Sequence, residues 1–455
     1  MYADIIVDIS VDALDKTYQY RIPEQMEELV RIGTPVQVPF GRGNRILHGF
    51  VVNLTEQPAF DVNRIKDILK VEQKQVPVEG QLLALAGFIR DRYGSTMNEA
   101  LKTVLPVRKK IKSVEEHWLN FAMEERFIMD ILHEYERKHY VAKVRLIRGL
   151  LAEGGTMTRR QADHQYQVKK PVIDSLVKEG ILTVTREKKY RNPLESAKQQ
   201  PDVSKVLNEE QREIVEDFAK EYQGGLRRPY LLYGITGSGK TEVFIRFLET
   251  VLAEGKQAIV LIPEIALTFQ TVSRFRQAFG ERVSVIHSRL SEGERYDQYE
   301  RARMGELDIM IGPRSALFTP FERLGAIILD EEHENSYISE GVPRYHSDEV
   351  ALFRARQTGA SVIFGSATPS VKSYLMAKEG RYKEYRLTRR AGDALLPDIH
   401  VVDLRQELKE RNRSVFSRIL QQKILDRLKK KEQIMLFINR RGYAGFVSCR
   451  NCGNV

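Results

Sequence analysis

Five nearly continuous apolar runs in the second half of the chain do most to restrict its fold. These runs are YLLYGI, QAIVLIPE, LDIMIGP, AIILDEE and SVIFGSAT, and they lie between residues 230 and 368. Each run is followed by a loop and then by a helical pattern. Strands that are apolar on both faces belong to a parallel sheet that helices cover on both sides. The pattern therefore predicts an α/β lobe over residues 205–395.

The first of these runs leads into a phosphate-binding loop. Residues 234–241 read G-I-T-G-S-G-K-T, which matches G-x4-G-K-[ST], and the helical pattern TEVFIRFLETVLAEG follows. This motif requires a strand before it and a helix after it, so a glycine-rich turn that matches by chance is the weaker alternative. Backbone N–H groups and the helix N-terminus bind phosphate in such a loop. The residues predicted to bind nucleotide here are Gly234, Thr236, Gly237, Ser238, Gly239, Lys240 and Thr241.

A group of charged residues, D-E-E-H at 330–333, follows the apolar run AIIL. A carboxylate at the carboxyl end of such a strand lies near the phosphate-binding loop. We expect Asp330 and the Thr241 hydroxyl to hold Mg²⁺, and Lys240 to reach the β- and γ-phosphates of ATP. Glu331 is predicted to act as general base on the attacking water. A solvated acidic turn is the alternative for D-E-E-H alone. The predicted catalytic residues are Lys240, Asp330 and Glu331.

The rest of the chain divides by pattern into further domains. Residues 1–105 begin with the short strand-like runs IIVDIS, TYQYRIP, TPVQVPF and ILHGFVVNL, which suggest a small barrel or sandwich, and a helical stretch, QLLALAGFIRDRYG, follows. Residues 115–192 read as largely helical at first. Two short helices and a strand with a basic tip then end this region. This is the outline of a winged helix, and a small helical spacer is the alternative. The polar residues 193–204 read as a linker.

Composition narrows the class of protein only slightly. The net charge is +10, but 62 acidic residues are interspersed, so charge alone supports a nucleic-acid partner no better than evenly. No apolar run reaches the ~18 residues that a membrane span needs, and the start MYADIIVDIS does not read as a signal peptide. The chain has two cysteines, which favours a reducing compartment. We expect a cytoplasmic protein.

The order of the motifs resembles one family. Along the chain stand G-I-T-G-S-G-K-T-E, P-E-I-x-L-T, H-S-x-L, G-x-R-S-A-L-F-x-P, D-E-E-H, G-S-A-T-P, L-T-R-R-A-G, F-x-N-R-R-G and C-x-x-C-G. This series closely resembles the PriA family of bacterial replication-restart helicases, in superfamily 2. The resemblance is dense over 205–455. It is weaker over 1–105, where T-Y-x-Y-x-I-P and V-P-F-G carry it.

The resemblance implies an ATP- and Mg²⁺-dependent 3′→5′ DNA helicase that acts at stalled or branched replication forks and loads the primosome. It implies an N-terminal barrel for the 3′ end of the nascent strand and a winged helix on duplex DNA. It also implies two RecA-like lobes, with a zinc module in the second. The implied partners are fork DNA, D-loops, single strands, single-stranded DNA-binding protein and primosome-loading proteins. We expect a monomer.

The resemblance also assigns roles to motor segments. The G-S-A-T-P segment at 365–369 would link nucleotide state to strand movement. Gln211 would contact adenine, and His333 would belong to the nucleotide site. PEIALTFQ at 263–270 and GPRSALF at 312–318 would grip the DNA strand.

Four residues of the first domain match the family's pocket for a DNA 3′ end: Tyr18, Gln19, Gly41 and Lys66. The family favours T-F-D-Y where this chain has T-Y-Q-Y at 17–20. An amide therefore replaces the carboxylate that would accept from the terminal 3′-OH, and an amide accepts more weakly. The alternative is an ordinary strand with Tyr18 and Tyr20 on alternate faces.

A second set of predicted DNA contacts follows the D-E-E-H segment: Tyr337, Tyr345 and His346. Aromatic residues there would stack on bases and report DNA occupancy to the ATP site. The family has Y-H-A-R-D where this chain has Y-H-S-D-E at 345–349, so its arginine contact is in doubt. The alternative is an aromatic-rich surface loop that does not bind DNA.

Cys449 and Cys452 match the first of the four cysteine pairs of the family's zinc module, and further pairs do not follow. We therefore expect a fragment in which residues 396–455 begin the second lobe. The alternatives for the pair are a redox site, which lacks its usual βαβ context, and two free thiols. With no arginine finger from a second lobe, the chain should bind ATP and DNA, hydrolyse ATP poorly and not unwind. A non-hydrolysing adaptor for fork DNA is the competing function.

We predict that the purified 455-residue chain carries no stoichiometric zinc. Zinc takes four ligands, and residues 433–455 offer two cysteines with no histidine, Asp or Glu. Elemental analysis measures this directly, with a longer chain that includes further cysteine pairs as the control; that chain should hold about two zinc ions, as the resemblance implies. One tightly held zinc per monomer of the 455-residue chain would mean that the ligand set is complete after all.

Overall fold

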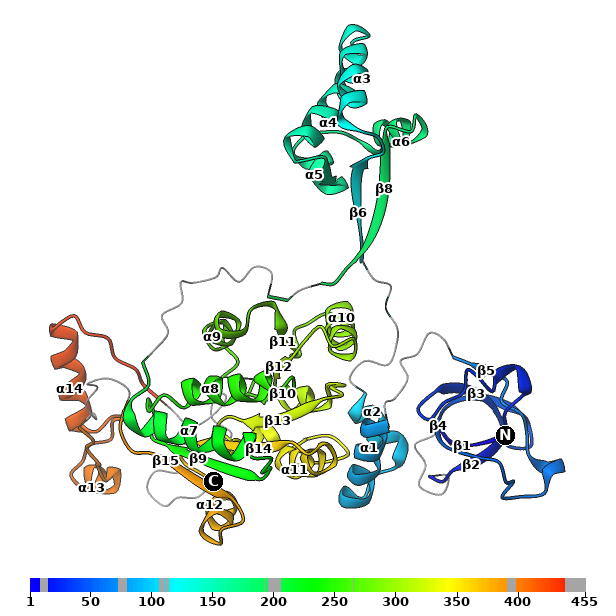
Figure 1. Cartoon of the computed structure of the whole chain (residues 1–455). Coiled ribbons are helices and arrows are strands. Elements are labelled where there is room, and N and C mark those ends of the chain that lie inside the picture. The colour runs from blue at the N-terminus through cyan, green and yellow to red at the C-terminus, as the bar shows by residue number, and fades with distance from the viewer. Residues whose placement is uncertain are drawn as a thin grey trace. The chain divides into compact units, whose positions relative to one another are not determined.

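The computed structural model describes residues 1–8, 15–72, 80–105, 111, 114–191, 193–194, 206–264, 266–390 and 398–437. The chain forms two compact units, residues 1–392 and 393–455. The first unit contains three sheets, one of seven strands, one of five and one of three (Figure 1). No helix among the described residues is long and apolar enough to span a membrane.

The largest sheet is parallel and confirms the predicted α/β lobe of RecA type. Its strand order is β11-β12-β10-β13-β14-β9-β15, and every neighbouring pair is parallel. Its strands are β9 (Pro229–Gly234), β10 (Gln257–Leu261), β11 (Val283–Val285), β12 (Ile309–Gly312), β13 (Leu324–Leu329), β14 (Ser361–Ser366) and β15 (Lys383–Leu387). The five predicted runs form β9, β10, β12, β13 and β14. The edge strands β11 and β15 were not predicted, because one is very short and the other is half polar.

Helices cover both faces of this sheet, each over its own hydrophobic core. One core includes Phe218 and Tyr222 of α7, Phe244 of α8 and Phe275 of α9. The other includes Ala351 of α11 and parts of α10 and α12. The helices are α7 (Glu209–Gln223), α8 (Lys240–Ala253), α9 (Phe269–Phe279), α10 (Glu292–Arg303), α11 (Ser347–Thr358) and α12 (Val371–Lys378). Leu194, at the start of the predicted linker, also belongs to the first core; most of that linker lies outside the described residues.

Two helices from the predicted first domain share the second of these cores. They are α1 (Gly80–Tyr93), which forms over the predicted helical stretch, and α2 (Met97–Val104). Leu85, Ile89 and Leu101 are buried in the same core as the α/β lobe, and Phe88 of α1 stacks on Phe353 of α11 with ring centroids 4.1 Å apart. The core of the α/β lobe therefore includes residues from before 105.

The five-stranded sheet is antiparallel, in the order β2-β1-β4-β3-β5. Its strands are β1 (Tyr2–Val7), β2 (Tyr18–Arg21), β3 (Pro35–Phe40), β4 (Arg45–Thr55) and β5 (Lys70–Val71). The segment before β5 also pairs with the edge strand β2, since Arg21 bonds to Lys66 and Ile68 through the backbone. Tyr18 and Tyr20 both pack against this sheet's core. The alternative that placed them on alternate faces is wrong, because residues two apart in a strand share a face.

The three-stranded sheet has the order β7-β6-β8 and its own core. Its elements are β6 (Val114–Phe121), α3 (Glu125–Arg137), α4 (Val141–Ala152), β7 (Thr156–Thr158), α5 (Arg159–His164), α6 (Lys170–Lys178) and β8 (Leu182–Lys189). The prediction of a largely helical start to this region is wrong, because residues 114–121 pair along their whole length with β8. Among the described side chains of β6 only Leu119 is buried, with Phe121 packed against the same core, so the sequence pattern shows an apolar side only weakly.

Short 3-10 helices complete the first unit: η2 (Glu24–Met26), η3 (Val62–Arg64), η4 (Gly280–Arg282), η5 (Arg314–Phe318) and η6 (Asn335–Tyr337). In the second unit the described residues form α13 (Leu404–Lys409) and α14 (Arg418–Lys429), and Ser417 caps the latter. Residues 396–397 and 438–455 of the predicted second-lobe segment, which include Cys449 and Cys452, lie outside the described residues, so the zinc half-site stays a prediction.

Candidate nucleotide-binding site

The phosphate-binding loop connects the end of β9 to the start of α8. Gly237 and Gly239 adopt φ values of +80° and +84°, which residues with a side chain rarely adopt. These two glycines let the chain turn sharply so that α8 begins at Lys240. Thr241 follows in the first helical turn and is partly buried, while Thr236 is exposed at the loop's tip. The loop therefore has the form that the sequence predicted.

Lys240 lies between this loop and the D-E-E-H segment. Its side chain is nearly buried, and its Nζ donates to the Gly234 carbonyl oxygen at 3.1 Å. The same Nζ lies 3.8 Å from Glu331 Oε1. The structure thus brings together two segments that are separated by about 90 residues in sequence.

Gln211 supports the loop from α7. Its Nε2 donates to the Ser238 carbonyl oxygen at 2.8 Å, and its Oε1 accepts from the Asn208 N–H at 3.0 Å. Gln211 is buried, so both ends of its amide already have partners. The adenine contact stays a prediction; these two bonds leave one hydrogen on Nε2 and one lone pair on Oε1 unused.

Asp330 and Glu331 follow the buried strand β13. Asp330 Oδ1 accepts from the Glu331 N–H at 3.0 Å, and Glu331 has φ +47°. Burial, and then the neighbouring Glu331 carboxylate, raise the pKa of Asp330 to about 6, although Lys240 opposes this. A bound cation would relieve this unfavourable burial of charge. Asp330 and the Thr241 hydroxyl offer the oxygen ligands that Mg²⁺ prefers, so the residues present fit this ion.

His333 connects the D-E-E-H segment to the S-A-T segment at the end of β14. Its Nδ1 lies 2.7 Å from Ser366 Oγ. Ser366 Oγ also accepts from the Thr368 N–H at 3.0 Å, so this hydroxyl is bonded both to His333 and to the backbone of the S-A-T segment. This contact joins β13 and β14 at the site.

The predicted 3′-end residues of the N-terminal sheet also gather in part. The ring of Tyr18 meets that of Phe40 edge-on at 4.9 Å, and Lys66 Nζ donates to the Gly41 carbonyl oxygen at 2.6 Å. Lys66 also donates to Asn44 Oδ1 at 2.7 Å. Sequence analysis missed Asn44, although asparagine in a G-R-G-N turn suits its observed φ of +49°.

Gln19 lies on the other side of β2 from Tyr18, and both ends of its amide are bonded. Its Nε2 donates to Asp4 Oδ1 at 3.3 Å, and its Oε1 accepts from the Ala59 N–H at 2.6 Å. The Gln19 oxygen is therefore engaged with the chain itself.

Tyr337 and Tyr345 are core residues in this structure. Both are buried; the Tyr337 hydroxyl lies 2.9 Å from the Leu261 carbonyl oxygen and 2.7 Å from that of Asp330. Neither ring presents a face to solvent on which a base could stack. His346 is half-buried, and its ring stacks on Tyr93. The predicted base-stacking role does not fit Tyr337 and Tyr345 in this structure, because their rings fill the core around β13.

Comparisons with known proteins agree with this geometry. Residues 4–106 match the 3′ DNA-binding domain of PriA, and residues 208–376 match the DEAD/DEAH box helicase family. The replication restart protein PriA of Bacillus subtilis is 33% identical over 100% of this chain and 64% of its own length. This chain belongs to the PriA family. PriA of Chlamydia pneumoniae is also 33% identical, over 99% of this chain and 60% of its own length.

The chain spans about 60–64% of the length of these PriA relatives. PriA of Haemophilus influenzae is 43% identical, but over 49% of this chain. Among solved structures, RecG bound to a three-way DNA junction covers 43% of this chain and 25% of its own, at 20% identity with a TM-score of 0.33. That likeness is too weak to bear on the function.

A second prediction, after that of the zinc content, concerns Lys240. Replacing it by alanine removes the cation that faces the phosphates, and we expect the affinity for a fluorescent ATP analogue with Mg²⁺ to fall at least about tenfold. Any ATP turnover should fall on the order of 10²-fold or more. The fold should be retained, with a circular dichroism spectrum that matches wild type, because the change removes a cation at the start of α8 and no apolar volume from a core. Lys220→Ala, on the exposed side of α7, is the control. Unchanged affinity in Lys240→Ala would contradict the site.

A third prediction concerns how the free energy of unfolding depends on pH. Because the pKa of Asp330 is raised from 3.8 to about 6 in the folded chain, the unfolded chain loses this proton first as pH rises. The stabilising effect is complete below about pH 4 and is lost as pH rises through 6. Asp330→Asn should therefore raise the free energy of unfolding at pH 7.5, without Mg²⁺, by on the order of 2 kcal/mol.

Urea denaturation at pH 5 and 7.5 measures this effect. The difference between variant and wild type should grow with pH, whereas Glu322→Gln, an exposed carboxyl change, should show no such growth. Parallel pH dependences for wild type and Asp330→Asn would show that the carboxyl is not buried as described.

Proposed function

We propose that this chain belongs to an ATP-dependent 3′→5′ DNA helicase that acts at stalled or branched replication forks and restarts replication. The observation that carries the proposal is the approach of Lys240 in the phosphate-binding loop to Glu331 in the D-E-E-H segment. It occurs in a chain whose first 106 residues include a match to a 3′ DNA-binding domain.

The mechanism follows from the positions of the side chains. The loop amides and Lys240 would bind the β- and γ-phosphates of ATP, and the partly buried carboxylate of Glu331 would orient and deprotonate the attacking water. Asp330 and Thr241 would hold Mg²⁺, which supplies charge neutralisation at the phosphates. His333, bonded to Ser366 at the end of β14, lies between the D-E-E-H and S-A-T segments. It would sense the nucleotide and pass its state to β14.

The other two sheets supply candidate DNA contacts. Helices α5 and α6, followed by β8 and its pairing with β6, fit a winged helix for duplex DNA. The N-terminal strands, with residues 66–68 also bonded to β2, fit a small barrel. Tyr18, Gly41 and Lys66 would form the pocket for a DNA 3′ end. Gln19 would support the pocket through Asp4 and Ala59 rather than read the hydroxyl itself.

The competing function is a fork-DNA adaptor that binds but does not hydrolyse ATP. An ATPase measurement on this chain, with and without forked DNA, separates the two. Stimulated turnover supports the motor, and binding without turnover supports the adaptor or a chain that needs a second lobe. We further propose single-stranded DNA-binding protein and primosome-loading proteins as partners, a monomeric state, and zinc in the longer protein.

A fourth prediction concerns the chemical group at the 3′ end of the leading strand. A fork whose leading strand ends at the junction with a 3′-OH should bind more tightly than the same fork with a 3′-phosphate, by about tenfold, because a phosphate adds bulk and charge where a hydroxyl is expected. Fluorescence anisotropy at matched salt measures both affinities. A fork without a leading strand is the control and should bind weakly to wild type and Tyr18→Ala alike. Equal affinities for the two leading-strand ends would remove the pocket and leave only general electrostatic binding.

A further inference from the structure

The third acidic residue of the D-E-E-H segment is bonded to helix α12. The Glu332 carboxylate accepts from the Ser370 N–H at 2.6 Å, and the hydroxyls of Ser370 and Ser373 lie 3.1 Å from it. Ser370 is the N-cap of α12, so this carboxylate lies at the positive end of the helix, where negative charge is favoured. Glu332 therefore ties the helix after the S-A-T segment to the segment that carries Glu331.

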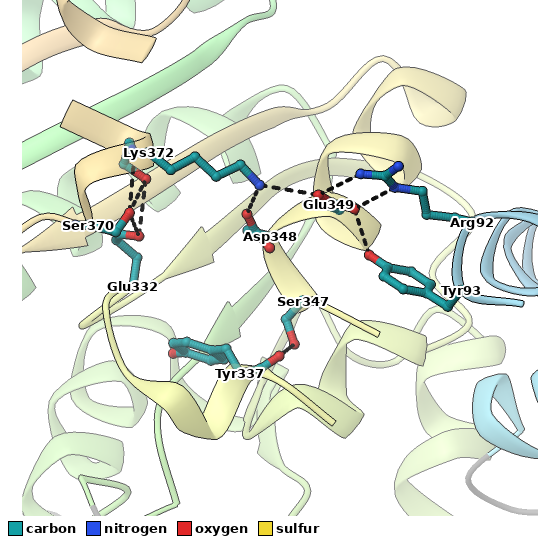
Figure 2. A network of polar contacts seen from close by, with 10 residues as sticks. Arg92, Tyr93, Glu332, Tyr337, Ser347, Asp348, Glu349, Ser370 and Lys372 are labelled. Carbon is teal, nitrogen blue, oxygen red and sulfur yellow. Dashed lines mark hydrogen bonds and ion pairs between the residues drawn. The ribbon is translucent and has the colours of Figure 1, made fainter. Parts of the chain in front are cut away.

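Lys372 extends this connection to helix α11. Its Nζ lies 2.7 Å from Asp348 Oδ2 and 3.4 Å from Glu349 Oε1, and Figure 2 shows it reaching both carboxylates. The helix dipole disfavours a cation in the first turn of a helix. The position of Lys372 therefore depends on these two carboxylates of α11.

Glu349 in turn bonds to the last two residues of α1. Arg92 donates to both of its oxygens, at 2.9 and 3.2 Å, and the Tyr93 hydroxyl donates at 2.9 Å. Two parallel bonds of this kind are stronger than a single ion pair. The Glu349 side chain is only 22% exposed. The Arg92 bond, together with those of Tyr93 and Lys372, outweighs the opposing effect of burial and lowers the pKa of Glu349 to about 2.

The first turn of α11 makes one more contact with the ATP site. Ser347 Oγ donates to the Tyr337 carbonyl oxygen at 2.8 Å, and the Tyr337 hydroxyl lies 2.7 Å from the Asp330 carbonyl oxygen. The consecutive residues 347, 348 and 349 thus contact Tyr337, α12 and α1, respectively (Figure 2). These contacts, together with the backbone of α12, lead from α1 to Glu332 in the D-E-E-H segment.

We propose that Glu349 is a positioning residue that couples helix α1 to the ATP site through Lys372 and α12. A shift of α1 changes the Arg92–Glu349 pair, Lys372 follows, and α12 carries the bonds to Glu332, the neighbour of Glu331. Because α1 follows the N-terminal sheet in sequence, a ligand of that sheet would regulate nucleotide binding by this route. That last step rests on the proposed function, whereas the coupling within the lobe does not.

Two variants on opposite sides of the pair test the coupling. Glu349→Gln keeps the shape and removes the charge. Arg92→Met removes the partner from a side chain that is 58% exposed, so it should fold normally. Lys378→Met is the control, because it removes a different ion pair of the same helix α12. Lys378 is as exposed as Lys372, at 47% against 46%, but it pairs with Glu384 and not with α11. Hydrogen exchange of the nucleotide-free chain and titration with a fluorescent ATP analogue are measured for each.

In both test variants we expect amide exchange in residues 330–337 and 371–378 to accelerate on the order of threefold to tenfold, and the analogue to bind more weakly by a similar factor. Lys378→Met should change neither quantity. If exchange changes only within residues 80–93 and 346–350, or nowhere, the pair is a local link and the proposal is wrong. Exchange is read without nucleotide, so a chain that fails to bind ATP would overturn the proposed function and still decide the coupling.

Discussion

Three neighbouring parallel strands, β13, β14 and β9, determine where the chemistry of this chain lies. In a parallel sheet the carboxyl ends of all strands meet at one edge. Asp330 follows β13, Ser366 ends β14 and Gly234 ends β9. Their register brings Leu329 opposite Phe364, and Ser366 opposite Tyr233. The short contacts of the site, from Lys240 to the Glu331 carboxylate and from His333 to Ser366, follow from this arrangement of the backbone.

The central strands of the α/β lobe could be predicted because they are buried on both faces, so their sequences are apolar throughout. β6 could not be predicted in this way, since its partner β8 lies about 60 to 75 residues further along and half of its side chains are polar. The packing of α1 on α11 could not be predicted either, because the two helices are also far apart in sequence. Phe88 and Phe353 are ordinary helix residues in sequence, and only the fold makes them neighbours.

At the candidate site, motif chemistry predicted which residues meet but not all of their partners. The loop geometry and the approach of Lys240 to Glu331 agree with expectation. Tyr337 and Tyr345 were predicted as base-stacking residues because this loop resembles the aromatic-rich loop of the family. They lie in the core because this loop folds back over β13. The bonds of Glu332 to α12 had no signal in the sequence, since an acidic run does not show which carboxylate faces which element.

Gln211 has a consequence for base selection. Its amide bonds to Ser238 and Asn208, and these two bonds fix which end of the amide is the donor and which is the acceptor. Each end keeps one unused site, a second hydrogen on Nε2 and a second lone pair on Oε1. Adenine presents a donor and an acceptor on neighbouring atoms, whereas guanine presents two acceptors there. An amide held in this orientation would pair with adenine and would leave its oxygen unpaired against guanine.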